Sequence, residues 1–127
     1  MFSGSKAFSG FAVPDTAVAK KFYTEVLGLD VDDSEMGILQ LNIAGDTTIV
    51  VYPKENHEPA GFTVLNFPVE DIDAAIEKLT GRGVELLRYE GFGQDDKGVV
   101  RKSDENPGPA IAWFTDPAGN VFSVMEL

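Results

Sequence analysis

Cysteine is absent from this chain, and histidine occurs once, at His57. The lack of cysteine excludes disulfide bonds, thiolate metal sites and a thiol nucleophile. No nucleophile–base pair and no nucleophile-elbow motif can be found, which argues against hydrolytic triad chemistry. His57 stands in a polar segment, so we interpret it as a solvated side chain, with metal ligation or acid–base work as the alternative.

Basic residues are also few. Ten lysines and arginines stand against 21 aspartates and glutamates, and the net charge is −11. Nucleic-acid-binding proteins neutralise phosphates with clustered basic side chains, and the basic residues here are scattered. We therefore expect no nucleic-acid partner. The acidity is typical of a well-solvated surface, and a preference for cationic ligands is the alternative interpretation.

Long hydrophobic runs are missing as well. No apolar stretch is long enough to cross a membrane, and the N-terminal MFSGSKAFSG lacks the apolar segment of a signal peptide. These absences predict a cytoplasmic, soluble protein with no membrane partner. The 127 residues, 43% of them apolar, suit a single compact domain with a sizeable core.

Two segments of the chain resemble each other, GFAVPDTAVAKKFYTEVLG and NFPVEDIDAAIEKLTGRGV. Each begins as a short strand and then places an aspartate, Asp15 or Asp71, where a helix would start. An aspartate at that position caps the free amide groups of the first helical turn. The amphipathic pattern that follows predicts a helix, and each helix should end near a glycine, Gly28 or Gly81.

Strand patterns follow each predicted helix, so the order is β-α-β-β-β, twice. The predicted strands cover residues 29–35, 37–44 and 47–52 in the first half, and 84–90, 110–115 and 121–126 in the second. The segment PKENHEPAG between the halves is polar and rich in turn residues. We therefore expect a first module at 1–54, a connector at 55–61 and a second module at 62–127 within one compact domain.

A long irregular stretch, residues 91–110, interrupts the second half. It reads GFGQDDKGVVRKSDENPGPA and carries glycines and prolines toward both ends. Loops of this length without secondary structure are uncommon in compact domains and often act as lids over a site. A lid and a flexible insertion are the two interpretations of this stretch.

The repeat and three phrases, VPDTAVAKKFYTEVLGL, NFPVEDIDAAIEKLTGRGV and WFTDPAGNVFSV, resemble the vicinal oxygen chelate superfamily. This family includes glyoxalase I, extradiol dioxygenases, fosfomycin-resistance proteins and bleomycin-resistance proteins. The resemblance implies an α+β fold, in which two β-α-β-β-β modules form paired curved mixed sheets around a central cup, with the helices outside. It also implies a homodimer. In metal-dependent members, four side chains hold a divalent ion in the cup as a Lewis acid.

The positions of this sequence that correspond to the four ligands carry Phe8, Val51, Val64 and Ser123. Three of these side chains are hydrocarbon, and a lone serine hydroxyl is a poor ligand for a divalent ion. We therefore expect neither a metal nor another cofactor.

The alternation of side chains along the strands predicts what lines the cup. If Thr115 lies opposite Asn120, Phe114 points into the cup and Trp113 points toward the helices, and a slip of one residue reverses this. The result is an apolar lining with a few polar points, as in a small-molecule pocket. The predicted lining consists of Phe8, Val51, Tyr52, Phe62, Val64, Asn66, Phe114, Ser123 and Met125.

Such a cup favours a metal-free small-molecule-binding protein, similar to the bleomycin-resistance proteins. The alternative is a metal-dependent lyase or dioxygenase of the same superfamily with a non-standard ligand set. That alternative holds if the strand register differs from the one assumed here, or if His57 joins a nearby carboxylate. The candidates are Glu35, Asp46 and Glu58. A cup filled by its own side chains would instead indicate a structural or regulatory dimer.

Overall fold

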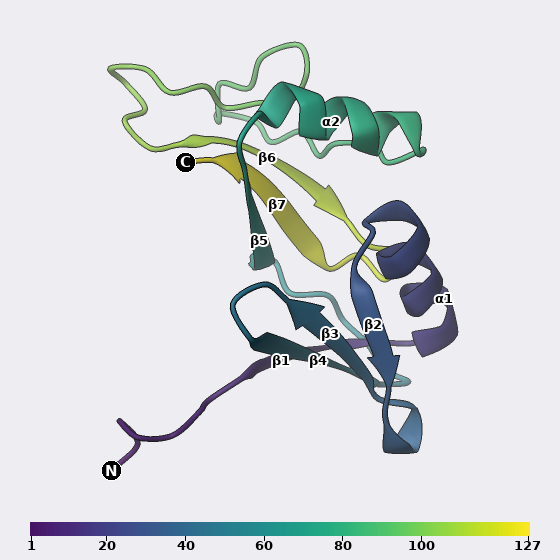
Figure 1. Ribbon diagram of the computed structural model, residues 1–127. Coiled ribbons are helices and arrows are strands. Elements are labelled where there is room, and N and C mark those ends of the chain that lie inside the picture. Colours follow the sequence, from purple (N-terminus) through teal and green to yellow (C-terminus); the bar gives the residue numbers. More distant parts are fainter. The chain divides into compact units, whose positions relative to one another are not determined.

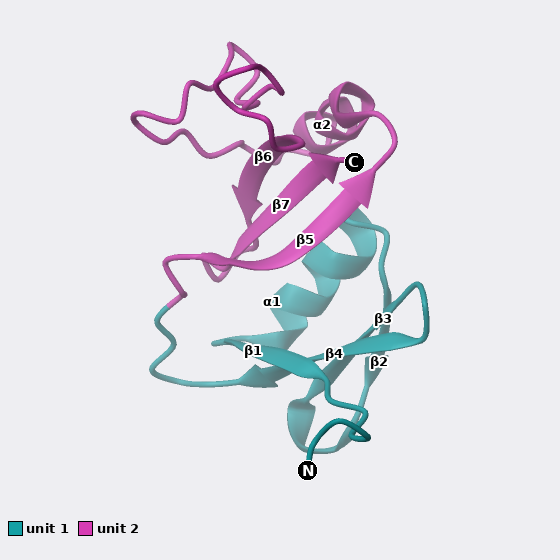
Figure 2. Cartoon of the chain, turned by 90° about the vertical axis from the view of Figure 1, so that its left-hand side faces the viewer, with its two compact units in different colours: residues 1–58 teal, residues 59–127 magenta.

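The computed structural model describes all 127 residues, which divide into two compact units, residues 1–58 and 59–127 (Figure 2). The division falls inside the segment that was predicted to connect two modules. Each unit contains one mixed sheet and one principal helix (Figure 1), so the predicted α+β class is confirmed. None of the helices has both the length and the apolar character that a membrane crossing requires.

The first unit contains a four-stranded sheet in the order β1-β4-β3-β2. Strands β1 and β4 are parallel, and the other neighbours are antiparallel. The helix between β1 and β2 continues from an α-helix into a π-helix. The elements are β1 (Ser9–Val13), α1 (Thr16–Lys21), η1 (Phe22–Val26), β2 (Asp30–Asp33), η2 (Glu35–Gly37), β3 (Leu39–Ile43) and β4 (Thr47–Pro53).

The start of α1 and its buried side confirm the sequence pattern. Asp15 Oδ1 accepts hydrogen bonds from the backbone N–H groups of residues 17 and 18, at 3.0 and 3.2 Å. Ala19 and Tyr23 are buried, and the ring of Tyr23 packs edge-on against Phe11 of β1 with the centroids 6.4 Å apart. The face of the sheet that carries Phe11 is therefore the face that α1 covers.

The second unit contains a three-stranded sheet in the order β5-β7-β6, with β5 parallel and β6 antiparallel to β7. Helix α2 lies along one face of this sheet, and the long loop before β6 projects beyond it (Figure 1). The elements are β5 (Thr63–Val69), α2 (Ile72–Gly81), β6 (Ala110–Thr115) and β7 (Val121–Glu126).

Helix α2 is capped at its start by two carboxylates. Asp71 Oδ1 accepts from Ala74 N at 3.1 Å, and Glu126 Oε2 of β7 accepts from Ile72 N at 2.9 Å. Helix α2 ends at Gly81, as predicted, but Gly81 is not the left-handed residue. Gly81 lies in the last helical turn, and Gly83, with φ of +86°, adopts the left-handed conformation that ends the helix.

The strand predicted at residues 84–90 is wrong. Leu86 forms an isolated bridge with Phe114, and Leu87 N donates to Trp113 O at 2.8 Å, so the chain pairs with β6 only briefly. Tyr89 N then donates to the side-chain Oε1 of Gln94 at 2.6 Å. Because this amide is used within the loop, it cannot extend a ladder along β6, and the sheet keeps three strands.

The turn between β6 and β7 is closed by two buried polar side chains. Asp116 Oδ1 accepts from the backbone of Ala118 and Asn120 at 3.0 and 2.9 Å, and Asn120 Nδ2 donates to Asp116 Oδ2 at 3.0 Å. Asp116 N also donates to Asn120 O at 3.0 Å. These two residues thus close the hairpin, and Thr115 pairs with Val121. The predicted pairing of Thr115 with Asn120 is off by one residue.

Candidate functional site

The sheet of the second unit has two chemically different faces. Phe122 is fully buried, and its ring packs edge-on against Phe67 at 6.1 Å and Phe114 at 5.7 Å. Val69 pairs with Glu126, which caps α2, so this phenylalanine-rich face is the one beneath the helix. Phe114, predicted to line the cup, lies here instead. The reason is the one-residue shift of the hairpin.

The opposite face, called here the second face, carries a row of three paired residues: Asn66, Ser123 and Trp113. Ser123 is fully buried, and its Oγ donates to Asn66 Oδ1 at 2.5 Å. Asn66 is exposed, and the hydrogen bond with Ser123 uses its Oδ1 and not its Nδ2. The pair therefore leaves an amide N–H available to an acceptor on a ligand.

Trp113 belongs to a cluster of three aromatic side chains, called here the aromatic cluster. Its ring centroid lies 5.4 Å from that of Tyr89 and 5.4 Å from that of Phe92, and the latter two are 5.1 Å apart. Tyr89 is 37% exposed and Phe92 is 50% exposed. Large aromatic surfaces in mutual contact and open to solvent are suited to contact with the ring of a ligand.

Sequence reasoning missed this cluster for two reasons. Trp113 was assigned to the helix side by the off-by-one hairpin, although the possibility of a slip pointed to the second face. Tyr89 was assigned to a strand that does not form. The available signal was the recurrence of aromatic residues at the start of the long loop, Tyr89 and Phe92, in a segment otherwise rich in glycine and charge.

The segment that carries Phe92, residues 88–99, is called here the aromatic loop. Gln94 Nε2 donates to Leu87 O at 2.9 Å and to Gly98 O at 2.7 Å. The guanidinium of Arg88 donates to two backbone carbonyls further along, at 2.7 and 2.6 Å. Side-chain hydrogen bonds therefore hold the aromatic loop in one conformation, so that it could form one wall of a binding site.

The other predicted lining residues of this unit occupy different environments. Met125 lies on the second face, next to the row of Ser123. Val64 is placed where the pairing of β5 with β7 shifts by one residue, and Phe62 precedes β5 and is 71% exposed.

The predicted lining residues of the first unit fall on both faces of its sheet. Val51 is fully buried and pairs with Phe11 and Leu39, so it lies on the face beneath α1. Tyr52, its neighbour, therefore lies on the other face and is partly exposed. Phe8 is exposed at one end of β1, and it lines a groove of about 430 Å³ that the sheet shares with the N-terminal segment.

The residues at the four family ligand positions do not fit a metal ion. Val51 is hydrocarbon and is enclosed under α1, and the hydroxyl of Ser123 is engaged by Asn66. His57 Nε2 is buried without a hydrogen-bond partner. No three His, Cys, Asp or Glu side chains of the chain gather in a way that could hold an ion.

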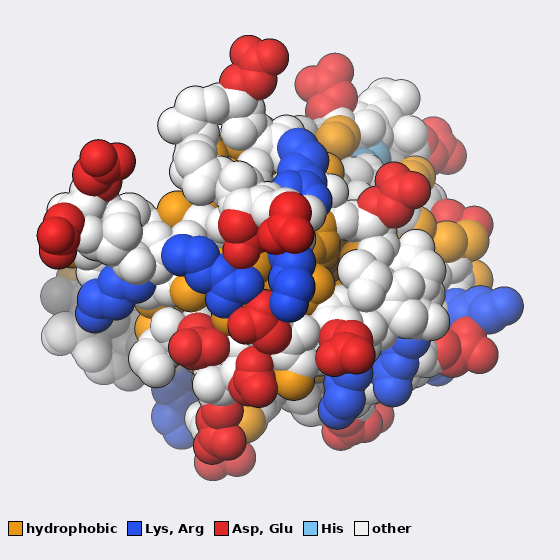
Figure 3. All heavy atoms as spheres, turned by 90° about the horizontal axis from the view of Figure 1, so that it is seen from above, with side chains coloured by type: hydrophobic (Ala, Val, Ile, Leu, Met, Phe, Trp, Pro, Cys, Tyr) orange, Lys and Arg blue, Asp and Glu red, His pale blue; other side chains and the backbone are white.

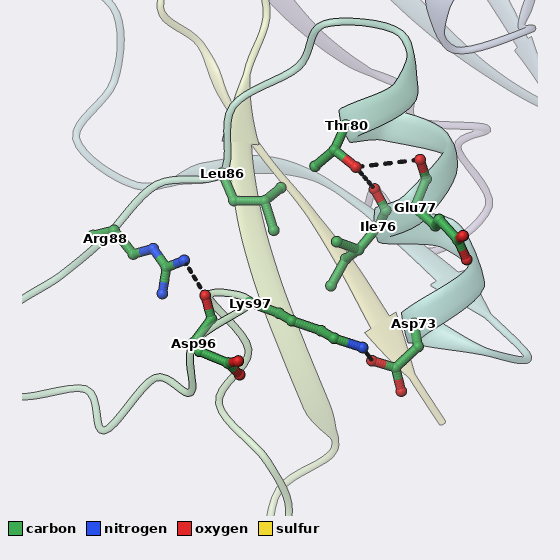
Figure 4. A pocket seen from close by; sticks show the side chains of 8 residues that line it. All are labelled: Asp73, Ile76, Glu77, Thr80, Leu86, Arg88, Asp96 and Lys97. Atoms are coloured by element: carbon green, nitrogen blue, oxygen red, sulfur yellow. Dashed lines mark hydrogen bonds and ion pairs between the residues drawn. The ribbon is translucent and has the colours of Figure 1, made fainter.

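A second hollow, of about 530 Å³, lies between α2 and residues 86–97 (Figure 4). Ile76 and Leu86 form its apolar walls, and Lys97 crosses from the loop to Asp73 of the helix with Nζ and Oδ1 3.2 Å apart. The hydrogen bonds from Arg101 and Lys97 lower the pKa of Asp73 to about 2.

Acidic and basic side chains alternate over this side of the molecule, with hydrophobic groups between them (Figure 3). Asp73 is paired with Lys97, and Arg88 is bound to backbone carbonyls, so much of the charge at the hollow is compensated within the chain. The second face, with its exposed rings and its available amide, is therefore the stronger candidate for a ligand site.

Comparison with known proteins agrees with this fold. The family model described as Glyoxalase/Bleomycin resistance protein/Dioxygenase superfamily matches residues 8–124. No curated protein matches the sequence significantly.

Three solved structures illustrate the similarity. TnmS3, an antibiotic binding protein from Streptomyces sp. CB03234, is 27% identical with a TM-score of 0.66, and the match covers 97% of both chains. A glyoxalase/bleomycin resistance protein from the same organism is 28% identical over 94% of this chain and 99% of its own, with a TM-score of 0.60. The fosfomycin resistance protein FosX from Listeria monocytogenes is 16% identical over 100% and 95%, with a TM-score of 0.68. The chain therefore belongs to the glyoxalase/bleomycin resistance protein/dioxygenase superfamily.

Proposed function

We propose that this protein binds a small organic molecule without transforming it, on the second face of the sheet in residues 59–127. The observation that carries the proposal is the aromatic cluster, in which Phe92 and Tyr89 are exposed while in contact with Trp113. Placing a ligand ring against these side chains would remove apolar surface from water and add favourable edge or face contacts between rings.

The polar row next to the cluster suggests the chemistry of the ligand. Asn66 Nδ2 can donate to a carbonyl or similar acceptor, while Ser123 holds the amide in place through Oδ1. We therefore propose a planar aromatic compound with an oxygen acceptor. The net charge of −11 would favour the approach of a ligand that is also cationic. The predicted lining residues Asn66, Ser123 and Met125 belong to this proposal.

The hydrogen bond between Ser123 and Asn66 favours binding of the ligand over its chemical conversion. The hydroxyl of Ser123 donates to an amide oxygen, which is not a base strong enough to activate it as a nucleophile. The similarity to TnmS3, described as an antibiotic binding protein, also supports a role in binding a small molecule of this kind.

The proposal is tested by calorimetric titration of the protein with three probes: mitoxantrone, 1,4-naphthoquinone and bleomycin. Trp113 is the single tryptophan, so its fluorescence reports binding at the cluster directly. We expect saturable binding of at least one probe, weakened about ten-fold by Phe92→Ala, the loss of one good ring contact.

Phe62→Ala is the matched control, because Phe62 is an exposed phenylalanine of the same unit outside the cluster. Equal affinity in Phe92→Ala and the wild-type protein, or failure of all three probes to bind, would contradict the proposal.

We also propose that the protein is a cytoplasmic homodimer. The first unit exposes several large apolar side chains, among them Phe2, Phe8 and Met36, which a second copy could cover. Light scattering coupled to size exclusion should give twice the mass of the chain, and a monomer at micromolar concentration would contradict the dimer. Fractionation of the native cells tests the location.

A further inference from the structure

We propose that Asp73 and Arg101 are positioning residues for the ligand site. Their ion pair ties the aromatic loop to helix α2 and so keeps Phe92 against Trp113. The effect on ligand affinity rests on the proposed function, whereas the effect on the position of Phe92 does not.

The pair has the geometry of a strong link. Arg101 Nη2 lies 2.7 Å from Asp73 Oδ1, and Nη1 lies 3.1 Å from Oδ2, so the guanidinium meets the carboxylate with two parallel hydrogen bonds. The third nitrogen of the guanidinium, Nε, donates to Asp95 Oδ2 at 2.8 Å. Arg101 therefore joins a residue of α2 to a residue of the aromatic loop, and a lysine could not make all three contacts.

A second ion pair connects the same two elements. Lys97, within the aromatic loop, places Nζ 3.2 Å from Asp73 Oδ1, and its side chain spans the mouth of the hollow beside α2 (Figure 4). Asp73 is thus the helix residue that pairs with both Lys97 and Arg101. Its pKa of about 2 agrees with this double pairing.

The link continues from Asp95 to the ring of Phe92. Asp95 Oδ1 accepts from Lys97 N and Val99 N, both at 2.9 Å, and so closes the end of the aromatic loop. The adjacent Gln94 binds the backbone at both sides of the loop, and Phe92 is two residues before it. A shift of Asp95 would therefore be transmitted to Phe92 through a short, hydrogen-bonded segment.

The aromatic loop needs such a link because the sheet holds only its ends. Leu87 N donates to Trp113 O, and Val100 exchanges two backbone hydrogen bonds with Ile111, but the residues between them do not pair with β6. The ring of Phe92 is half exposed, so packing alone fixes it weakly. The ion pairs supply the contact with the helix that the missing strand would otherwise provide.

The test uses acrylamide quenching of the fluorescence of Trp113, which needs no ligand. We expect Arg101→Gln and Asp73→Asn each to raise the quenching constant about two-fold. The double variant should raise it by less than the sum of the two effects, because both changes remove the Asp73–Arg101 pair, while each also removes one contact of its own, with Asp95 or with Lys97. Lys102→Gln and Glu77→Gln are matched controls, because each removes the same charge near the replaced residue from a side chain that makes no ion pair, and they should quench like the wild type.

Circular dichroism would show that each variant keeps its fold. Additive effects of the two changes, or wild-type quenching in both, would overturn the inference. For any probe that binds the wild-type protein, Arg101→Gln should lower the affinity about three- to ten-fold, the size expected for an exposed ion-pair network. Changed quenching with no probe bound by the wild type would refute the proposed function and leave this inference standing. The reverse result would refute the inference alone.

Discussion

The position of Phe114 in the core and of Trp113 on the second face predicts opposite effects for two neighbouring substitutions. Phe114 is 1% exposed and packs edge-on against Phe122. Replacing a buried phenylalanine by alanine removes its transfer free energy and leaves a cavity, which together cost about 3–5 kcal/mol. That is a large part of the roughly 5–15 kcal/mol that stabilises a typical domain.

Trp113, in contrast, is half-buried on the second face, and its partners Tyr89 and Phe92 are themselves exposed. Trp113→Ala should lower the free energy of unfolding by about 1–2 kcal/mol, because only part of its surface is removed from water. It should also abolish most of the binding of any aromatic probe. Phe114→Leu, a milder change of the core, should destabilise by about 1 kcal/mol and leave probe affinity unchanged.

Urea unfolding followed by circular dichroism measures the free energy of unfolding, and calorimetry measures the affinity for the probe. Phe114→Leu keeps the comparison available if Phe114→Ala is too unstable to purify. A stable Phe114→Ala protein together with a severely destabilised Trp113→Ala protein would mean that the hairpin has the register in which Thr115 faces Asn120. Both the core and the candidate site would then be misassigned.

Three further predictions concern the helix cap, the polar row and pH. Asp71→Ala should destabilise the second unit by about 1 kcal/mol, since a helix N-cap is lost, and thermal unfolding would measure this against Glu70→Ala as control. Ser123→Ala should cost about 1 kcal/mol in urea unfolding, because the hydrogen bond to Asn66 disappears while the Asn66 amide stays accessible to water; a loss above 3 kcal/mol would contradict that account. The pKa of Asp73 lies below its ordinary value of 3.8, so its stabilising pairing is present above that value and is lost as the pH falls toward about 2. Acrylamide quenching of Trp113 should therefore stay constant from pH 8 to 5 and rise between pH 4 and 2, and an equal rise in Asp73→Asn would refute this origin.

The elements whose signals are local in sequence were predicted well. Asp15 and Asp71 mark the helix starts because a cap involves a side chain and amides two or three residues away. The strand and helix that open each half followed from the same kind of local pattern, and three short phrases of the sequence carried the resemblance to the family. The lack of metal-binding residue types at the four family positions could likewise be read directly from the sequence.

What failed depended on interactions between distant or competing groups. Residues 84–90 have a composition that suits a strand. The side chain of Gln94, however, accepts a hydrogen bond from the backbone amide of Tyr89, which a strand would use to pair with β6. The link between Asp73 and Arg101 joins residues 28 positions apart, and nothing in either local sequence indicates the other. The aromatic cluster depends on both the failed strand and the shifted hairpin, so it could not be predicted from either alone.

The position of the candidate site is finally a consequence of the β6–β7 turn. In the alternative register, Trp113 would enter the helix side of the sheet, where its indole N–H would need a buried acceptor, and Phe114 would leave the ring cluster around Phe122. The buried pair of Asp116 and Asn120 opposes this slip, because its hydrogen bonds exist only when those two residues close the turn. The β6–β7 turn therefore determines which aromatic ring of β6 stands beside Ser123.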